Sequence, residues 1–514
     1  MTLTEQPTTA GAPIAETPPG EYDAVLVDLA ASVPGGQTIE FAITPLDVTR
    51  VPVWTVTRWQ DDGEMLNGIG YGLTDDRARV GGWAELLEQA AGHHAIPKMN
   101  RRTATYAQLK REGVAVLDPL ELRLPAGSTY THEMSVVWVE AHRLDVSAAD
   151  FKGEPTWVPV EAAATHNFDC RLPAGTAPLY QCISNGSGAG DTIERALTHA
   201  LLELVQRDGN SAGYRACDRG IKIELDGVRH PQTRELLARL DAAGIDVLVK
   251  LADTNLGMTN LYVVGRDRGE PPHPICLTGC GEAAHPDREQ ALLKALTEYC
   301  ASRVRKLYTH GPLELQQHLF PPGYLDRFTD DPATVEESRS FQAVSEWMNA
   351  SADEVLRRLE PTIFRVERTV KFSDLPTVPM DSANDTGTLL NVVADRYAAD
   401  KLDVFWVDLS PEGKPCSAVK VIAPAMEVET VTYHRVGVRN LKRLIERGYD
   451  FVGLGAPPSG AKQVPLSERM RTELGDDAWL HPERADALLG PLYGLYREPD
   501  IHAIPIQKLA NGGN

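Results

Sequence analysis

The sequence lacks three features that would place it in a membrane, a secretory or a nucleic-acid-binding class. No uncharged apolar run reaches the roughly 20 residues that span a bilayer, and no basic segment followed by an apolar one marks a secretory signal. Lysine and arginine number 51 against 72 acidic residues, and the net charge of -21 repels polyanions such as nucleic acid. We therefore expect a cytoplasmic protein without membrane or nucleic-acid partners.

Metal-binding cysteine motifs are also missing. The seven cysteines include no C-x-x-C pair. Cys276 and Cys280 lack a second Cys/His pair at a spacing suited to zinc. Reduced thiols are the better interpretation. His93 and His94 are adjacent, so they point to different faces of a helix, and we expect them to be exposed at a helix end.

The composition itself is that of an ordinary globular protein, with 42% hydrophobic and 24% charged residues. Residues 1–20 are rich in Thr, Pro, Ala and Gly and predict a flexible tail. Residues 21–514 are expected to form the folded domain. Within it, residues from about 312 to 381 are polar with prolines at their margins, which predicts a peripheral insertion.

Short Val- and Ile-rich runs alternate with helical patterns, which predicts an α/β fold. Strands are expected at Val51–Val56, Ser135–Glu140, Asp246–Leu251, Leu261–Val264, Val404–Val407 and Ala418–Ile422. Helices are expected over Gly82–Ala91, Thr192–Arg207 and Asp287–Leu307, where apolar residues recur at helical spacing.

Two of these helices carry acidic and amide side chains at helical spacing. Glu85 and Glu88 lie three residues apart and share a helical face, and Glu203 and Gln206, followed by Arg207, repeat the arrangement. Carboxylates held together repel, and Mg²⁺ is the natural compensating cation because it prefers oxygen ligands. The alternative is a solvated helix face.

A glycine-rich segment, Ser184 to Asp191, precedes the second helix. Such a segment can present backbone N–H groups to an anion at a helix N-terminus. No Gly-Lys-Ser/Thr follows, so it is not a Walker A loop, and its glycine spacing does not fit a dinucleotide fingerprint. The alternative is a tight turn in which Asp191 or Thr192 caps the helix.

The combination of motifs resembles the YcaO family. Ser184-Asn185-Gly186 with Gly190, Ala196 and Glu203 to Asp208 is similar to the central signature of that family. Three further segments occur in the family's order: Gly70 to Thr74 with the Glu85/Glu88 helix, Thr278 to Arg303, and Val419 to Pro424.

The resemblance implies a YcaO fold, with mixed sheets flanked by helices and a nucleotide site between helices. It also implies ATP and Mg²⁺ as cofactors and phosphorylation of a backbone amide oxygen in a ribosomally made precursor peptide. Attack by a substrate Cys, Ser or Thr then gives an azoline, whereas an amine gives a macroamidine and sulfide a thioamide. Implied partners are the peptide, a leader-binding protein or second YcaO protein, and a second copy of the chain.

Carried over by position, the resemblance assigns metal binding to Glu85, Glu88, Glu203 and Gln206. It assigns nucleotide binding to Tyr71, Ser184, Asp191, Arg195, Arg207 and Arg303, and it identifies no catalytic residue.

Several of these positions depart from the family pattern: Tyr71 stands for a lysine, Asp191 for Asn, Arg195 for Glu and Gln206 for Glu. One interpretation is a retuned site, in which Asp191 supplies an oxygen ligand and Arg195 replaces the lost lysine's charge. The other is a non-catalytic scaffold that binds substrate. We favour the retuned site because three carboxylates and two arginines remain. The end of the chain carries only Pro505, and no leader-binding domain is seen, which favours a divergent, stand-alone member.

Overall fold

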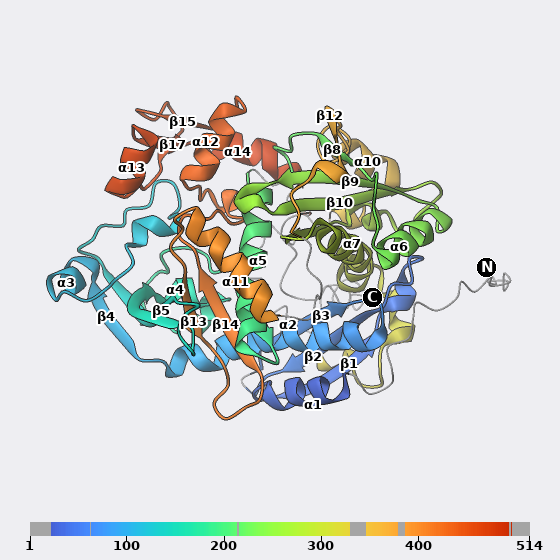
Figure 1. The fold of residues 1–514 in the computed structure, drawn as a ribbon, viewed down its shortest axis with the longest axis horizontal. Helices are drawn as coiled ribbons and strands as arrows, with labels where there is room; N and C mark the ends of the chain where they lie inside the picture. Colours follow the sequence, from blue (N-terminus) through green and yellow to red (C-terminus); the bar gives the residue numbers. More distant parts are fainter. Residues whose placement is uncertain are drawn as a thin grey trace, which may run out of the picture.

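The computed structural model describes residues 22–61, 63–212, 215–328, 346–378, 386–492 and 495. In these ranges the chain forms an α/β fold of four sheets flanked by helices (Figure 1). The predicted tail at 1–20, the last residues with Pro505, and residues 329–345 and 379–385 of the predicted insertion lie outside the described residues. The α/β class expected from the alternating pattern is confirmed.

The sheets differ in size, and β12 and β8 form a parallel pair whereas the other strand pairs are antiparallel. The first sheet has the order β1 (Gln37–Ala42), β2 (Val53–Trp59), β3 (Met65–Tyr71). The second has β11 (Gly281–His285), β10 (Thr259–Asp267), β9 (Ile245–Asp253), β8 (Ile221–Glu224), β12 (Arg368–Lys371). The third has β4 (Arg101–Thr105), β5 (Ser135–Leu144), β13 (Phe405–Asp408), β14 (Ser417–Ile422), β7 (Ser187–Gly190), with β6 (Lys152–Pro159) beside β5. A small sheet has β15 (Val452–Leu454), β17 (Ala478–Leu480), β16 (Lys462–Gln463).

Three long helices, α2 (Asp75–Ala95), α5 (Ile193–Asn210) and α7 (Arg288–His310), lie around the centre of the molecule (Figure 1). The other helices are α1 (Asp23–Ser32), α3 (Tyr106–Arg111), α4 (Val160–Ala163), α6 (Pro231–Ala242), α8 (Leu313–Gln316), α10 (Ala352–Leu359), α11 (Thr386–Ala399), α12 (Val438–Glu446), α13 (Glu468–Leu474) and α14 (Pro482–Leu489). α2 begins seven residues before the predicted Gly82 because Thr74 caps it, accepting a hydrogen bond from the Arg77 N–H at 3.3 Å.

Each of the three long helices follows the end strand of a different sheet. The units are β3–α2, β7–α5 and β11–α7, and every helix also contacts the end strand of another unit: α2 contacts β7, α5 contacts β11, and α7 contacts β3. The three units therefore close a ring. Side chains that point inward from α2, α5 and α7 meet in its middle.

Glycines allow each end strand to lie directly on its helix. A Cβ atom at Gly70 of β3 would sit 1.9 Å from the Gly82 nitrogen, and one at Gly188 of β7 would sit 2.2 Å from the Ala196 oxygen. At Gly281 of β11 it would lie 2.0 Å from the Ala295 oxygen. These distances are far inside van der Waals contact with backbone atoms, so any side chain would push the strand off the helix.

The described part of the predicted insertion is tied to the rest of the fold. β12 pairs in parallel with β8 at the edge of the second sheet. Tyr324 and Phe328 are buried beside Phe41, and the rings of Phe41 and Tyr324 meet edge to face with their centroids 5.1 Å apart. The division of the chain into a tail, a domain and an insertion stays a prediction.

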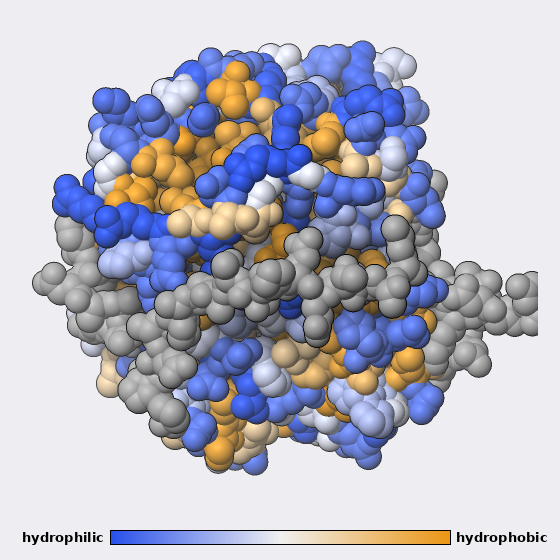
Figure 2. All heavy atoms as spheres, turned by 90° about the vertical axis from the view of Figure 1, so that its right-hand side faces the viewer, coloured by the Kyte–Doolittle hydropathy of each residue, from blue (hydrophilic) through white to orange (hydrophobic). Residues whose placement is uncertain are grey.

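Within the described ranges, no helix combines the length and apolar character that crossing a bilayer requires. The face on the right of Figure 1 mixes apolar and hydrophilic side chains (Figure 2). Mixtures of this kind are usual for protein surface that contacts water.

Because Gly281 lies against the α7 backbone, we expect Gly281→Ala to lower the free energy of unfolding by at least about 1–3 kcal/mol. Denaturant unfolding followed by circular dichroism measures the change. Gly269→Ala is the matched control, because a Cβ atom there meets nothing within 4 Å. Equal stability of the two variants would contradict the assigned strand–helix contact.

Candidate functional site

Four carboxylates gather in the middle of the ring. Glu85 and Glu88 come from α2, Glu203 from α5 and Glu298 from α7, and all are partly buried. Burial raises the pKa of Glu85, and the charges of Glu203 and Glu298 raise it further. Burial also raises the pKa of Glu88 well above its ordinary value, and Glu203 and Glu85 add to the effect. The four side chains therefore form one electrostatically coupled cluster.

Backbone N–H groups hold three of these carboxylates in place. Glu85 accepts from Ile69 N at 2.9 Å, Glu88 from Ala189 N at 3.0 Å, and Glu203 from Gly186 N at 2.9 Å. Ile69 lies in β3, Ala189 lies in β7, and Gly186 directly precedes β7. The bond from Ala189 to Glu88 of α2 links two neighbouring units of the ring. The carboxylates are thus preorganised by the edges of the sheets that surround them.

Arg207 lies beside the cluster and contacts three carboxylates. Its guanidinium is 3.3 Å from Glu203, 3.3 Å from Glu282 and 3.2 Å from Glu429. The Gln206 amide also donates to Glu282, at 3.3 Å. The structure thus places Gln206 and Arg207 next to the cluster, and Gln206 faces a carboxylate of β11.

Tyr71 reaches the cluster from the end of β3. Its hydroxyl donates to Glu298 Oε2 at 3.0 Å. Burial raises the pKa of Tyr71 well above its ordinary value, and the charge of Glu298 raises it further. Tyr71 therefore stays neutral and contributes a hydrogen bond where a lysine would contribute a positive charge.

Arg195 lies farther along the same face of α5, Asp191 directly precedes the N-cap Thr192, and both side chains are more exposed. Arg195 Nε donates to Asp191 Oδ1 at 2.6 Å, and the Arg195 side chain is 48% exposed. One turn onward, His199 Nε2 is 3.8 Å from Glu88 Oε1. Because Arg195 pairs with Asp191, the two charges offset each other. The geometry therefore gives no support to the hypothesis that Arg195 replaces the charge of the missing lysine.

The glycine-rich segment is a strand rather than an anion-binding turn. Ser187–Gly190 forms β7, which pairs with β14. Thr192 caps α5 by accepting from Arg195 N at 3.2 Å, as the alternative interpretation expected. Ser184 is exposed in the turn before β7. The glycines serve close packing and the N–H bond to Glu203.

Arg303 does not lie with the other predicted site residues. It is fully buried, with Asp47 at 3.0 Å and Asp267 at 2.8 Å. Five residues separate it from Glu298, so it points roughly 140° away around α7. The prediction that Arg303 serves the phosphates is therefore corrected: its guanidinium ties α7 to the segments that carry the two aspartates.

His93 is likewise not exposed, contrary to the prediction. Its side chain is buried, and Nδ1 lies 3.1 Å from Asp169 Oδ1. The α2 helix continues past His93 to Ala95, so this position still packs against the segment that carries Asp169. A buried ion-pairing partner, which local sequence does not reveal, accounts for the difference.

Several residues at the site escaped the sequence analysis. Glu282 and Glu298 lie within the segment from Thr278 to Arg303 that resembles the family, but no role was assigned to them, and Glu429 and Arg215 lie outside the quoted segments. Lys420 of β14 is buried and donates to Ile183 O at 2.7 Å and to Ser187 Oγ at 3.4 Å. Burial lowers the pKa of Lys420 to about 8, and the charges of Glu203 and Glu88 oppose the shift. Lys420 is therefore a buried basic residue close to Glu203 and Glu88.

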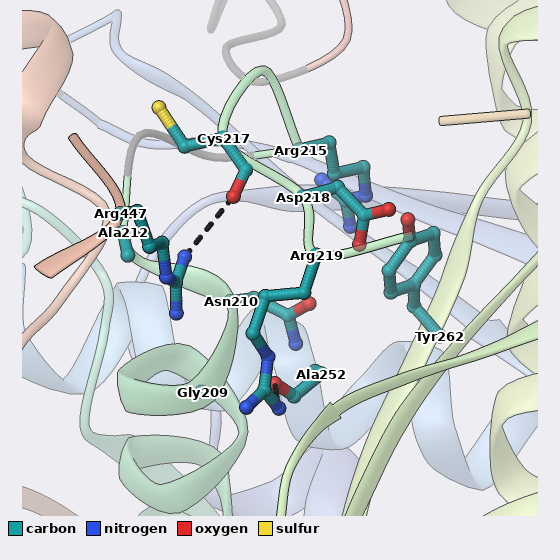
Figure 3. Close-up of a pocket in the computed structure, with 10 residues that line it drawn as sticks. All are labelled: Gly209, Asn210, Ala212, Arg215, Cys217, Asp218, Arg219, Ala252, Tyr262 and Arg447. Atoms are coloured by element: carbon teal, nitrogen blue, oxygen red, sulfur yellow. Dashed lines mark hydrogen bonds between the residues drawn. The ribbon is translucent and has the colours of Figure 1, made fainter. Parts of the chain in front are cut away.

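A small pocket lies beyond the C-terminal end of α5 (Figure 3). Arg447 donates to Cys217 O at 3.0 Å and Arg219 to Ala252 O at 2.8 Å. The pocket holds about 20 Å³, enough for a single water molecule. It is too small for a nucleotide, and its lining residues Arg447 and Arg219 bind backbone carbonyls.

The donor set of the carboxylate cluster suits a hard divalent cation. Carboxylates converge from three helices, and the raised pKa values of Glu85, Glu88 and Glu298 indicate that their ionisation is unfavourable without a compensating cation. Mg²⁺ is normally held by one or two carboxylates together with phosphate oxygens, and Arg207 lies nearby for those phosphates. Within the described ranges no three Asp, Glu, His or Cys side chains are arranged to hold a metal ion by themselves, so the residues present fit Mg²⁺ only together with nucleotide phosphates.

Comparisons with known proteins agree with this geometry. The family model described as YcaO cyclodehydratase, ATP- and Mg²⁺-binding, matches residues 69–427. An uncharacterized protein of Methanothermobacter thermautotrophicus is 28% identical over 77% of this chain and 91% of its own length. A protein encoded in the tfuA 3' region of Rhizobium leguminosarum bv. trifolii is 23% identical over 77% of this chain and 85% of its own.

Solved structures share the fold. YcaO from Methanopyrus kandleri, bound with AMPPCP and Mg²⁺, has a TM-score of 0.53 at 22% identity and covers 78% of this chain and 89% of its own. A heterocyclase in complex with substrate and cofactor has a TM-score of 0.56 at 18% identity over 80% of this chain. This chain spans about half of that heterocyclase, 52% of its length. The predicted resemblance is confirmed: the chain belongs to the YcaO cyclodehydratase family of ATP- and Mg²⁺-binding enzymes.

Proposed function

We propose that this protein activates a backbone amide of a ribosomally made precursor peptide by ATP-dependent O-phosphorylation, giving an azoline by cyclodehydration of a Cys, Ser or Thr residue. The observation that carries the proposal is the convergence of Glu85, Glu88, Glu203 and Glu298 beside Arg207 in the ring of three units. Carboxylates for a metal ion and a guanidinium for phosphates are what phosphoryl transfer requires.

Bound ATP with Mg²⁺ supplies the phosphoryl group that turns an amide oxygen into a leaving group. Glu85, Glu88 and Glu203 are the proposed metal ligands, since backbone N–H bonds already hold them in position. Arg207 offsets negative charge on the phosphates, and Tyr71 orients Glu298 through its hydroxyl.

Ser184, Asp191 and Arg195 form the more exposed end of the same site. We propose that they contact the nucleotide from the rim, with Gln206 at the inner end. Arg303 takes no part in the proposed site. The peptide substrate, a leader-binding or second YcaO protein, a homodimer and a cytoplasmic location remain proposals that rest on the family resemblance.

Two alternatives to azoline formation remain, one with a different nucleophile and one without catalysis. An amine or sulfide nucleophile in place of the substrate side chain would give a macroamidine or a thioamide, and the phosphorylation step would be the same. A non-catalytic scaffold is the second class, motivated by Tyr71 and Gln206 at positions where a charged side chain was expected. The anchored carboxylates favour an enzyme, because a scaffold has no need to hold like charges together.

Removing one anchored carboxylate tests the proposed metal–nucleotide site directly. We expect Glu203→Ala to weaken binding of ATP with Mg²⁺ by at least about 10-fold, the effect typical of a lost metal ligand or its direct support. Isothermal titration calorimetry measures the affinity. Glu235→Ala, which removes an exposed carboxylate from α6, is the control and should bind as the parent does. Absence of binding in the parent, with or without peptide, would leave the scaffold as the better function.

The raised pKa of Glu88 predicts how pH and Mg²⁺ act on stability. Because the folded-state pKa lies above the ordinary value of 4.5, ionising Glu88 costs stability as pH rises from that value through the raised pKa. In metal-free buffer Glu88→Gln should therefore unfold at a higher temperature than the parent at about pH 8, and the difference should shrink toward about pH 5.

Added Mg²⁺ should reverse this order at the higher pH, because the cation stabilises the ionised parent and has one ligand fewer in the variant. Differential scanning fluorimetry across the pH range gives both results. A difference in melting temperature that stays constant with pH, or that grows toward acid, would contradict the assigned shift.

A further inference from the structure

The contact between Gln206 and Glu282 joins two buried polar side chains from different units of the ring. Gln206 is 3% exposed on α5, and Glu282 is 2% exposed on the end strand β11. Gln206 Nε2 donates to Glu282 Oε2 at 3.3 Å. An ionised carboxylate buried to this degree is stable only with compensating charge and hydrogen bonds.

Two arginines supply that compensation. Arg207 reaches Glu282 Oε2 at 3.3 Å, and Arg215 pairs with Glu282 Oε1. The Arg215 side chain is only 4% exposed, whereas that of Arg207 is 24% exposed and also contacts Glu203 of the carboxylate cluster. Both guanidinium groups therefore contact the Glu282 carboxylate, whose negative charge offsets the repulsion between them.

The amide at position 206 is the neutral member of this group. It donates a hydrogen bond that a carboxylate could not give, and a carboxylate at 206 would face Glu282 across the same 3.3 Å contact. The pair thus carries one negative charge between α5 and β11, and that charge sits on the β11 side. Moving it to α5 would keep the total charge and nearly the same volume.

We propose that Glu282 is a positioning residue of the nucleotide site: with Gln206 as its neutral partner and Arg215 as its buried counter-charge, it orients Arg207 toward the phosphates. Arg207 is the link, because the same guanidinium contacts Glu282 and the metal-ligand candidate Glu203. This inference rests on the proposed function, since it assumes that phosphates bind beside the carboxylate cluster.

A reciprocal exchange of the two side chains tests the proposal. We expect Glu282→Gln to weaken ATP binding in the presence of Mg²⁺ by about 10-fold or more, because the two arginines lose their anchor. Gln206→Glu should also weaken it, because two buried carboxylates then face each other. The double variant Q206E/E282Q should return to within about threefold of the parent, since the pair regains one charge beside both arginines. Glu235→Gln on α6 is the control for loss of an exposed carboxylate.

Thermal unfolding of the parent, the two single variants and the double variant, each without nucleotide, supplies the second readout. Each single variant should lower the melting temperature, and the double variant should recover most of the loss, which shows coupling between the two positions. Additive losses of melting temperature would overturn the pairing of Gln206 with Glu282, whether or not the parent binds ATP. Absence of ATP binding by the parent would defeat only the proposed function. Folded single variants with parental ATP affinity, or a double variant as weak as the singles, would overturn the positioning role.

Discussion

Glu85, Glu88, Glu203 and Glu298 bring like charges together, and burial makes ionisation of Glu85, Glu88 and Glu298 unfavourable. The rest of the site compensates for that repulsion. Backbone N–H groups of β3, of β7 and of Gly186 directly before β7 bind three of the carboxylates, Lys420 lies behind them, and Arg207 lies beside them. These partners hold the cluster together.

The ring of three strand–helix units makes this compensation possible. End strands of sheets have N–H groups without a strand partner on one side, and here such groups meet carboxylates instead. The strands come close enough because Gly70, Gly188 and Gly281 have no side chain where the helix backbone passes. A single set of close strand–helix contacts thus packs the core and positions the ligands. This coupling accounts for carboxylates on three separate helices acting as one site.

Three arginines of the predicted site lie in different surroundings in the structure. Arg207 is partly exposed and shared among three carboxylates at the site. Arg303, five residues after Glu298 and on a different face of α7, is buried between Asp47 and Asp267 and ties α7 to the segments that carry them. Arg195 is exposed and paired with Asp191, so it adds no net charge to the cluster. Tyr71, where the family pattern has a lysine, contributes a neutral hydrogen bond to Glu298.

The sequence by itself determined the α/β class, the helices that carry Glu85, Glu88 and Glu203, and the family. These depend on local periodicity and on spacing along the chain, which a single sequence displays. Only the tertiary structure decided that Glu298 joins the cluster, that Arg303 leaves it, and that Glu282 and Gln206 meet. Residues 206 and 282 are far apart in the chain, and their contact follows from the packing of β11 against α5. Arg303 and Glu298 share one helix, and only the neighbours of each face of α7 show which of them lies in the site.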